Sequence, residues 1–273
     1  MADRYGFQTI ATELEGRILT VTLNRPEKMN ALDIVMHDEL GELFGKIERD
    51  DDVDIVVLTG AGKAFCVGAD FDQMEANLER GGYEDGHPDL MNGSARMARS
   101  ILAVRQPMIA AVNGHAIGLG ATLALFCDVV YMAEGARIGD PHVKAGIVAG
   151  DGGPVLWPML VGMSRAKEYL MTGDLLTAEE ADRIGLVNHV VPRDEVVDAA
   201  KAMAQKLAAG AQIAIRFNKR LVNKELEDRV NKIYDLALAL EGLTFETADH
   251  REAVDSFLEK RPATFRSGKP GGT

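Results

Sequence analysis

Two short, nearly continuous apolar runs constrain the fold of this chain more than any other feature of its sequence. Residues 54–59 (Asp-Ile-Val-Val-Leu-Thr) and 108–112 (Met-Ile-Ala-Ala-Val) have the length and apolar character of strands that are buried on both faces. Each run is followed by glycine or asparagine and then by a stretch that can be helical. Residues 17–23 form a third strand candidate, in which apolar and polar residues alternate. This succession of strands, loops and helices predicts an α/β fold.

Helical patterns divide the chain into two regions. Residues 33–48 carry apolar side chains at helical spacing. Thr177 and Glu180 fit a capping box at the start of a later helix. From Asp194 onward the helical pattern is almost uninterrupted. We therefore predict an α/β core over residues 1–195 and a helical region over residues 196–273.

Composition and charge exclude several classes of protein. The chain has 273 residues, with 30 Lys and Arg against 42 Asp and Glu, and its net charge of −12 argues against a nucleic-acid or membrane surface. No run reaches the roughly 18 apolar residues of a membrane span, and the N-terminus lacks the apolar segment of a secretion signal. Two cysteines, Cys66 and Cys127, are too few for a disulfide framework. We expect a cytoplasmic protein with no nucleic-acid or membrane partner.

Two glycine-containing loops are the first candidates for a binding site. Residues 60–70 and 113–122 each lie between a predicted buried strand and a predicted helix. Glycine lets the backbone approach a ligand closely, and the start of a helix has unpaired N–H groups. Two such loops from neighbouring strands can converge on one oxygen as an oxyanion hole, although each loop alone is compatible with an ordinary tight turn. A dinucleotide motif is incomplete here, because Leu123 stands where its third glycine would be.

His142 and Asp151 are the candidates for acid–base chemistry. They lie in a glycine-punctuated loop, residues 140–153. A histidine that is oriented by a carboxylate acts as a general base or acid near neutral pH. Spacing alone leaves open a surface histidine beside an aspartate that caps a helix. No cluster of His, Cys and carboxylate residues has the spacing of a metal site, so we predict no metal.

In combination, these motifs resemble the crotonase superfamily, the enoyl-CoA hydratase/isomerase family. The resemblance covers almost the whole chain and implies a crotonase-like spiral of ββα turns with a C-terminal helical trimerisation region, assembled as a homotrimer or a dimer of trimers. Residues 24–32 are similar to the first CoA-contacting segment of the family, and residues 64–70 and 110–120 are similar to its two oxyanion loops. Residues 170–187 follow the family downstream. Residues 257–261 are similar to the tail that helps to hold the CoA nucleotide.

The resemblance also implies a small-molecule acyl-CoA substrate, and no cofactor beyond its CoA moiety. By position, the thioester oxygen is held by the N–H groups of Ala69 and Leu119. The remaining assignments are contacts to CoA, made by Arg25, Lys28, Ala31, Ala69, Asp70 and, from a neighbouring subunit, Lys260. Asp70 is expected to cap the following helix rather than to react.

The sequence departs from the best-known hydratases of this family at two positions. Those enzymes carry two glutamates, whereas the corresponding residues here are Thr122 and His142. Asp151, nine residues after His142, resembles the His–Asp arrangement of the family's C–C bond hydrolases that act on β-diketones. Those hydrolases usually lack a functional CoA site, whereas Arg25, Lys28 and Lys260 indicate that this chain keeps one.

We predict an enoyl-CoA hydratase-like lyase in which His142, oriented by Asp151, moves a proton. Thr122 is expected to position water, and His115 is a more remote candidate. One alternative is a C–C bond hydrolase or decarboxylase of a β-keto or malonyl-type thioester on the same scaffold. Another is a non-catalytic acyl-CoA-binding protein. Four apolar side chains and the segment 79–88 are candidates for the surroundings of the acyl group: Met74, Leu78, Met91 and Met97.

Overall fold

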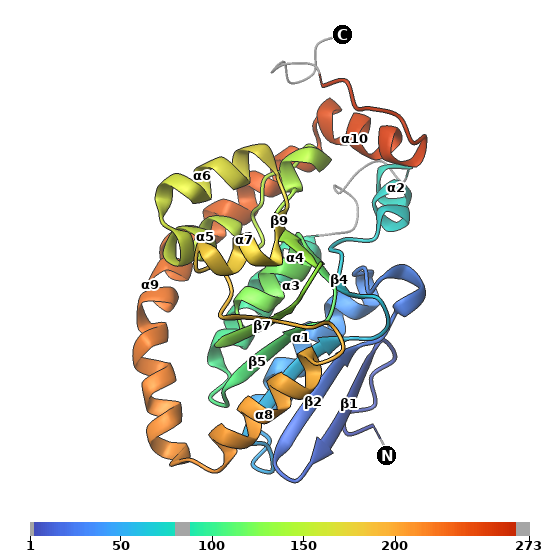
Figure 1. Cartoon of the computed structure of the whole chain (residues 1–273). Helices are drawn as coiled ribbons and strands as arrows, with labels where there is room; N and C mark the ends of the chain where they lie inside the picture. The colour runs from blue at the N-terminus through green and yellow to red at the C-terminus, as the bar shows by residue number, and fades with distance from the viewer. Residues whose placement is uncertain (1–2, 80–87, 266–273) are drawn as a thin grey trace.

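A six-stranded sheet lies at the centre of the molecule in the computed structural model, which describes residues 3–79 and 88–265, with the backbone alone for residues 88–92 (Figure 1). Its strand order is β1-β2-β3-β5-β7-β10, and all neighbours are parallel except β1 and β2. The strands are β1 (Ile10–Glu15), β2 (Ile18–Leu23), β3 (Ile55–Gly60), β5 (Met108–Val112), β7 (Val129–Ala133) and β10 (His189–Val191). The predicted α/β class is confirmed, and the three predicted strands are β2, β3 and β5.

A second, smaller sheet makes the chain wind as a spiral. Its strands, in the order β4-β6-β8-β9, are β4 (Ala64–Cys66), β6 (His115–Ile117), β8 (Arg137–Gly139) and β9 (Leu176–Thr177). The parallel strands β4, β6 and β8 each follow closely on one strand of the large sheet, namely β3, β5 and β7. The path therefore repeats strand, short strand and helix, which is the predicted spiral of ββα turns.

Helices cover both faces of the large sheet, which explains its continuous apolar runs. Val56 and Leu58 of β3 belong to the main core with α1 and α3, whereas Ile55 and Val57 face α8. The helices are α1 (Ile34–Glu48), α2 (Phe71–Glu79), α3 (Pro88–Ala103), α4 (Leu119–Leu125), α5 (Gly153–Val161), α6 (Met163–Thr172), α7 (Ala178–Arg183), α8 (Val196–Ala208), α9 (Gln212–Phe245) and α10 (Ala248–Leu258), with short 3-10 helices η1 (Pro26–Lys28) and η2 (His142–Ala145). None of the described helices is long and apolar enough to cross a bilayer.

Side-chain caps fix the starts of two predicted helices. The carboxylate of Asp33 accepts a hydrogen bond from the N–H of Met36 (2.9 Å) at the start of α1. The hydroxyl of Thr177 accepts one from the N–H of Glu180 (3.2 Å) at the start of α7. Such caps satisfy N–H groups that have no partner within the helix. The predicted start of each helix is therefore confirmed to within a residue.

The helical C-terminal region is packed into the core rather than appended to it. Ala200 and Ala204 of α8 are fully buried against β3 and β5. Tyr234 and Leu238 of α9 belong to the main core. In Figure 1, α9 leads from α8 to α10, which lies beside α2. The chain after residue 195 thus completes the layers that the α/β region begins.

Asn30 anchors the loop between β3 and β4. Its side chain is fully buried, and its amide nitrogen donates to the carbonyl oxygens of Ala61 (2.9 Å), Ala64 (2.9 Å) and Phe65 (3.1 Å). Its amide oxygen accepts from the N–H of Arg25 (2.9 Å). One side chain thus supplies the partners that these buried backbone groups require.

Replacing Asn30 with alanine should therefore destabilise the fold by about 2–3 kcal/mol, because buried carbonyl groups lose their donors. The measurement is chemical denaturation followed by circular dichroism. Asn24→Ala is the matched control, because Asn24 is exposed and its substitution should cost less than about 0.5 kcal/mol. Equal losses in the two variants would contradict the anchoring role of Asn30.

Candidate active site

A cavity of about 110 Å³ opens beside the carboxyl ends of the small parallel strands. Ala69 comes shortly after β4, Leu119 comes shortly after β6, and His142 comes shortly after β8, and all three line this cavity. The carboxyl ends of parallel strands are where α/β sheets commonly bind ligands. The spiral thus gathers residues from three separate loops at one place.

Glycines let the two predicted oxyanion loops approach each other closely. A Cβ atom on Gly68 would lie 2.9 Å from the carbonyl oxygen of Ile117, and one on Gly120 would lie 2.2 Å from that of Cys66. Gly68 and Gly118 also have positive φ angles, of +86° and +56°. Larger residues would push the two loops apart.

The N–H groups of Ala69 and Leu119 have no acceptor within the described part of the chain. Backbone hydrogen bonds hold the chain on both sides of Ala69, because Leu32 donates to Gly68 (2.7 Å) and accepts from Asp70 (3.0 Å). Leu119 is the first residue of α4, where N–H groups lack partners within the helix. Both donors belong to residues that line the cavity, which is the arrangement an oxyanion hole requires.

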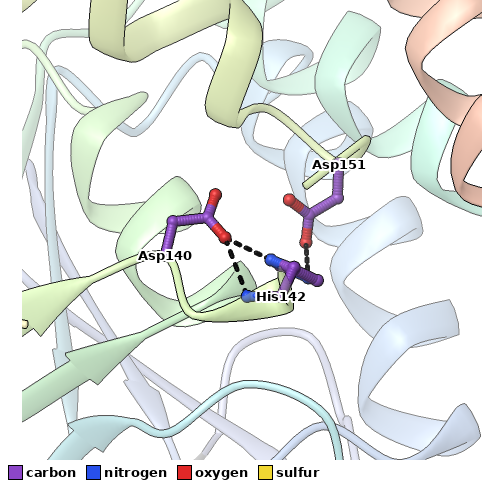
Figure 2. A group of neighbouring side chains, drawn as sticks. All are labelled: Asp140, His142 and Asp151. Atoms are coloured by element: carbon purple, nitrogen blue, oxygen red, sulfur yellow. Dashed lines mark hydrogen bonds and ion pairs between the residues drawn. The ribbon is translucent and has the colours of Figure 1, made fainter. Parts of the chain in front are cut away.

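The imidazole of His142 lies between two buried carboxylates (Figure 2). Its Nδ1 contacts the carboxylate of Asp140, and its Nε2 lies 3.4 Å from Oδ2 of Asp151. A Cβ atom on Gly118 would lie 3.4 Å from Cε1 of the ring, so the imidazole packs against the second glycine loop. The sequence-based pairing of His142 with Asp151 is present in the structure, with Asp140 as a further partner.

This arrangement favours the imidazolium form of His142. Burial alone would lower the pKa of His142, but the negative charges of Asp140 and Asp151 outweigh it and raise the pKa well above its ordinary value. Both ring nitrogens face carboxylate oxygens, and both can donate only when the ring is protonated.

Glu241 of α9 adds a third carboxyl group to the cavity. Its Oε1 lies 4.0 Å from Nε2 of His142, and its side chain is almost fully buried. Burial and the negative charge of Asp151 raise the pKa of Glu241 well above its ordinary value, so the neutral carboxylic acid is favoured. The site therefore offers a protonated carboxyl group, Glu241, and a carboxylate, Asp151, near the same ring nitrogen of His142.

Thr122 and Tyr234 hold Asp151 in place. The hydroxyl of Thr122 donates to Oδ1 of Asp151 (3.3 Å), and that of Tyr234 donates to the carbonyl oxygen of Asp151 (3.0 Å). Thr122 is itself buried and does not line the cavity. Its contact holds the carboxylate of Asp151, and a role of Thr122 in positioning water stays a prediction.

Some of the residues assigned to CoA line the cavity, and others lie outside it. Ala69 and Asp70 line it. The guanidinium of Arg25 donates to Asp70 (3.1 Å) and to the carbonyl oxygen of Ala31, and Lys28 forms an exposed ion pair with Asp72. Lys260 is exposed after α10, outside the cavity lining. Arg25 and Lys28 thus already contact carboxylates of the protein. A CoA phosphate would have to share these two cations with those carboxylates.

Asp70 was expected to cap a helix, and His115 was a more remote candidate for the site. The carboxylate of Asp70 accepts from the N–H of Asp72 (3.1 Å), as expected of a residue at the start of α2. His115 is exposed, and its Nδ1 accepts from the N–H of Arg137 (3.1 Å). His115 therefore does not contribute to the cavity.

The candidates for the surroundings of the acyl group are only partly placed. Met74 lines the cavity, whereas Met97 lies in the main core and Leu78 packs in a small cluster with Met74. The side chain of Met91 and most of the segment 79–88 lie outside the described residues.

Asp140 and Glu241 were not identified from the sequence. Asp140 stands two residues before His142, but only the observed loop turns its carboxylate back to the ring. Glu241 falls on the buried face of α9, with Tyr234, Leu238 and Phe245 at helical spacing. An ionisable residue on an apolar face is the sequence signal that could have indicated it.

One group of side chains has the composition of a metal site. The ligand atoms of Asp140, His142 and Asp151 lie within 4.8 Å of one another. In the structure, the two ring nitrogens are turned toward different carboxylates, so these groups face one another rather than a common central point. The absence of a catalytic metal remains a prediction.

The chain is similar to known proteins over most of its length. A model of a family described as enoyl-CoA hydratase/isomerase matches residues 13–268. The chain is 36% identical over 261 residues to a probable mitochondrial enoyl-CoA hydratase of Dictyostelium discoideum, covering 96% of this chain and 92% of that protein. It is 38% identical over 257 residues to a short-chain-enoyl-CoA hydratase of Clostridium acetobutylicum, covering 92% and 95%. A crystal structure of an enoyl-CoA hydratase/isomerase from Mycobacterium paratuberculosis superposes with a TM-score of 0.87 at 37% identity, covering 92% of this chain and all of that one.

The ion pair between Asp140 and His142 should make stability depend on pH. Because the pKa of His142 is raised in the folded protein, its contribution is fully present below the unfolded value of about 6.5 and is lost as the pH rises through the folded value. The difference in free energy of unfolding between the wild type and Asp140→Asn should therefore be largest near pH 6 and shrink at alkaline pH. Denaturation curves at several pH values measure it, and a difference that grows with pH would contradict this assignment.

Proposed function

Because the chain belongs to the enoyl-CoA hydratase/isomerase family, we propose that it is a lyase that adds water to the double bond of an enoyl-CoA thioester. The observation that carries the proposal is the placement of two buried carboxyl groups, Asp151 and Glu241, in a cavity whose wall also carries two unpaired N–H groups. The relatives from Dictyostelium discoideum and Clostridium acetobutylicum are named enoyl-CoA hydratases, which supports the same reaction.

The first requirement of hydration is a site for the charge that develops on the thioester oxygen. In this proposal, that oxygen accepts hydrogen bonds from the N–H groups of Ala69 and Leu119. Attack of water on the β-carbon then produces an enolate, whose negative oxygen stays between the two donors. Donors aimed at such an oxygen in a buried site are worth on the order of 3–4 kcal/mol each.

The second requirement is a base for water and an acid for the α-carbon. Asp151 accepts a proton from the attacking water, whose oxygen becomes the β-hydroxyl group. Glu241, favoured as the neutral acid, gives its proton to the α-carbon. One proton is taken up and one is delivered, so the substrate gains the elements of water.

In this mechanism, His142 restores the starting protonation of Asp151 and Glu241. After one turnover Asp151 carries the extra proton and Glu241 has lost one. Nε2 of His142 lies 3.4 Å from Asp151 and 4.0 Å from Glu241, so the imidazolium can pass a proton to Glu241 and take one from Asp151. Asp140 keeps the ring in place through Nδ1. The two carboxyl groups thereby replace the two glutamates whose positions hold Thr122 and His142 here.

We further propose that the protein assembles as a homotrimer or a dimer of trimers, and that it is cytoplasmic. The N-terminal half of α9 supports assembly, because it exposes four large apolar side chains: Ile213, Phe217, Leu221 and Val222. Contiguous exposed apolar surface on a monomer is characteristic of protein interfaces. The molar mass in solution, measured by light scattering, tests this part of the proposal.

A C–C bond hydrolase of a β-ketoacyl thioester is the second candidate function. It is favoured by one specific observation, the ion pair of His142 with Asp151 in the cavity, which resembles the pair in the family's β-diketone hydrolases. Both reactions pass through an enolate held by the same two N–H groups. Incubation with crotonyl-CoA and, separately, with acetoacetyl-CoA distinguishes them: hydration gives 3-hydroxybutyryl-CoA from the first, whereas hydrolysis gives acetate and acetyl-CoA from the second.

Glu241→Gln should lower kcat for hydration of crotonyl-CoA by about 10²–10⁴-fold, because the amide cannot donate a proton as an acid. KM should change little, since the CoA-binding residues are untouched. The measurement is the loss of absorbance of the conjugated enoyl thioester. The matched control is Glu225→Gln, an exposed position on the same helix, which should keep wild-type activity. Wild-type turnover by Glu241→Gln would remove Glu241 from the mechanism.

A further inference from the structure

A second pair of polar side chains lies in the cavity, on the wall built by α1 and α3. His37 of α1 and Ser94 of α3 both line it, and Nε2 of His37 lies 3.2 Å from Oγ of Ser94. The two residues are only 6% and 5% exposed. Neither takes part in the mechanism proposed above.

Neighbouring residues hold His37 and Ser94 in a defined position. A Cβ atom on Gly93 would lie 2.5 Å from Cε1 of His37, so only glycine there leaves space for the ring. The hydroxyl of Tyr234 donates to the carbonyl oxygen of Ser94 (3.3 Å) as well as to that of Asp151 (3.0 Å). One buried tyrosine thus links the segment that carries Ser94 to the segment that carries the reacting carboxylate.

The remaining lining near this pair is largely apolar. Met74, Ile147 and Phe245 line the same cavity, and the polar residues Gln73 and Asn77 are hydrogen-bonded to each other (3.1 Å). A purely alkyl group that filled the cavity would exclude water from the imidazole and the hydroxyl, and would leave the hydrogen-bonding capacity that their mutual contact does not use without a partner.

The hydrogen-bonding capacity of the pair matches a hydroxyl group. If Ser94 donates to Nε2 of His37, the serine oxygen still accepts a further hydrogen bond. If Nε2 donates instead, the serine hydrogen is free to be donated. A substrate hydroxyl group satisfies both cases, because it can donate and accept.

Charge disfavours an anionic group next to this pair. Burial lowers the pKa of His37, so the ring is neutral. Carboxyl groups of Asp33, Asp70 and Asp151 line the same cavity. The imidazolium of His142 lines it too, but Asp140 and Asp151 already pair with that ring, so a carboxylate on the acyl chain would compete with them for one cation.

We propose that the acyl group of the substrate is short and carries a hydroxyl group, which hydrogen-bonds to His37 and Ser94 in the cavity. The inference rests on the proposed function, and it narrows the substrate class to hydroxylated short-chain enoyl-CoA thioesters. The cavity volume of about 110 Å³ supports a short chain.

Binding of saturated acyl-CoA thioesters tests the inference independently of catalysis, because these compounds are not hydrated. Two isosteric pairs exchange a terminal methyl group for a hydroxyl group: pentanoyl-CoA with 4-hydroxybutanoyl-CoA, and hexanoyl-CoA with 5-hydroxypentanoyl-CoA. In at least one pair, calorimetry should give a Kd at least about tenfold lower for the hydroxylated member. Equal or weaker binding of both hydroxylated compounds would overturn the inference and leave the proposed hydration untouched.

The Ser94→Ala variant tests whether Ser94 causes the preference for the hydroxylated thioester. The variant should lose most of the tenfold preference while keeping the affinity for the alkyl member within about twofold. Ser100→Ala, the same substitution on the same helix, is the control and should keep the preference. A Ser94→Ala variant that still prefers the hydroxylated compound, or that loses affinity for both members equally, would contradict the assignment. Absence of hydration of any enoyl-CoA, with the binding preference intact, would refute the proposed function instead.

Discussion

The ion pairs that hold the imidazole of His142 between Asp140 and Asp151 are the interaction on which the candidate site depends. They fix a ring against Gly118, at the start of the helix whose first N–H group faces the cavity. A neutral ring could donate to only one of the two carboxylates, and a residue with a side chain at 118 would be strained at the positive φ of +56° that Gly118 adopts. The contacts of His142 thus connect the reacting carboxylate of Asp151 to the second oxyanion loop.

The C-terminal helices complete this region from the other side. Glu241 and Phe245 of α9 line the cavity, and His250 of α10 contacts the carbonyl oxygen of Ala145 in the short helix that carries His142 (2.8 Å). These contacts exclude water from the carboxyl groups and thereby raise the pKa of Glu241. The C-terminal helices are therefore part of the site, and burial together with the charge of Asp151 favours the neutral form of Glu241.

The sequence was sufficient for features that depend on local patterns. Continuous apolar runs identified β3 and β5, and capping residues such as Asp33 identified helix starts, because both signals lie within a few residues. Glu241 could not be paired with His142, because 99 residues separate them and only the packing of α9 brings them together. The contacts of Arg25 with Asp33 and Asp70 were equally hidden, since a cation shows its charge in the sequence but not its partner.

In the proposed mechanism, one acyl oxygen lies between two main-chain donors while the buried carboxyl groups face the carbons beside it. A crystal structure of the protein with a non-reactive acyl-CoA bound tests it most directly. We predict that the thioester oxygen lies about 2.7–3.1 Å from the nitrogen atoms of both Ala69 and Leu119, with the α- and β-carbons facing Glu241 and Asp151. A bound thioester whose oxygen contacts neither nitrogen, or whose chain turns away from His142, would contradict the account.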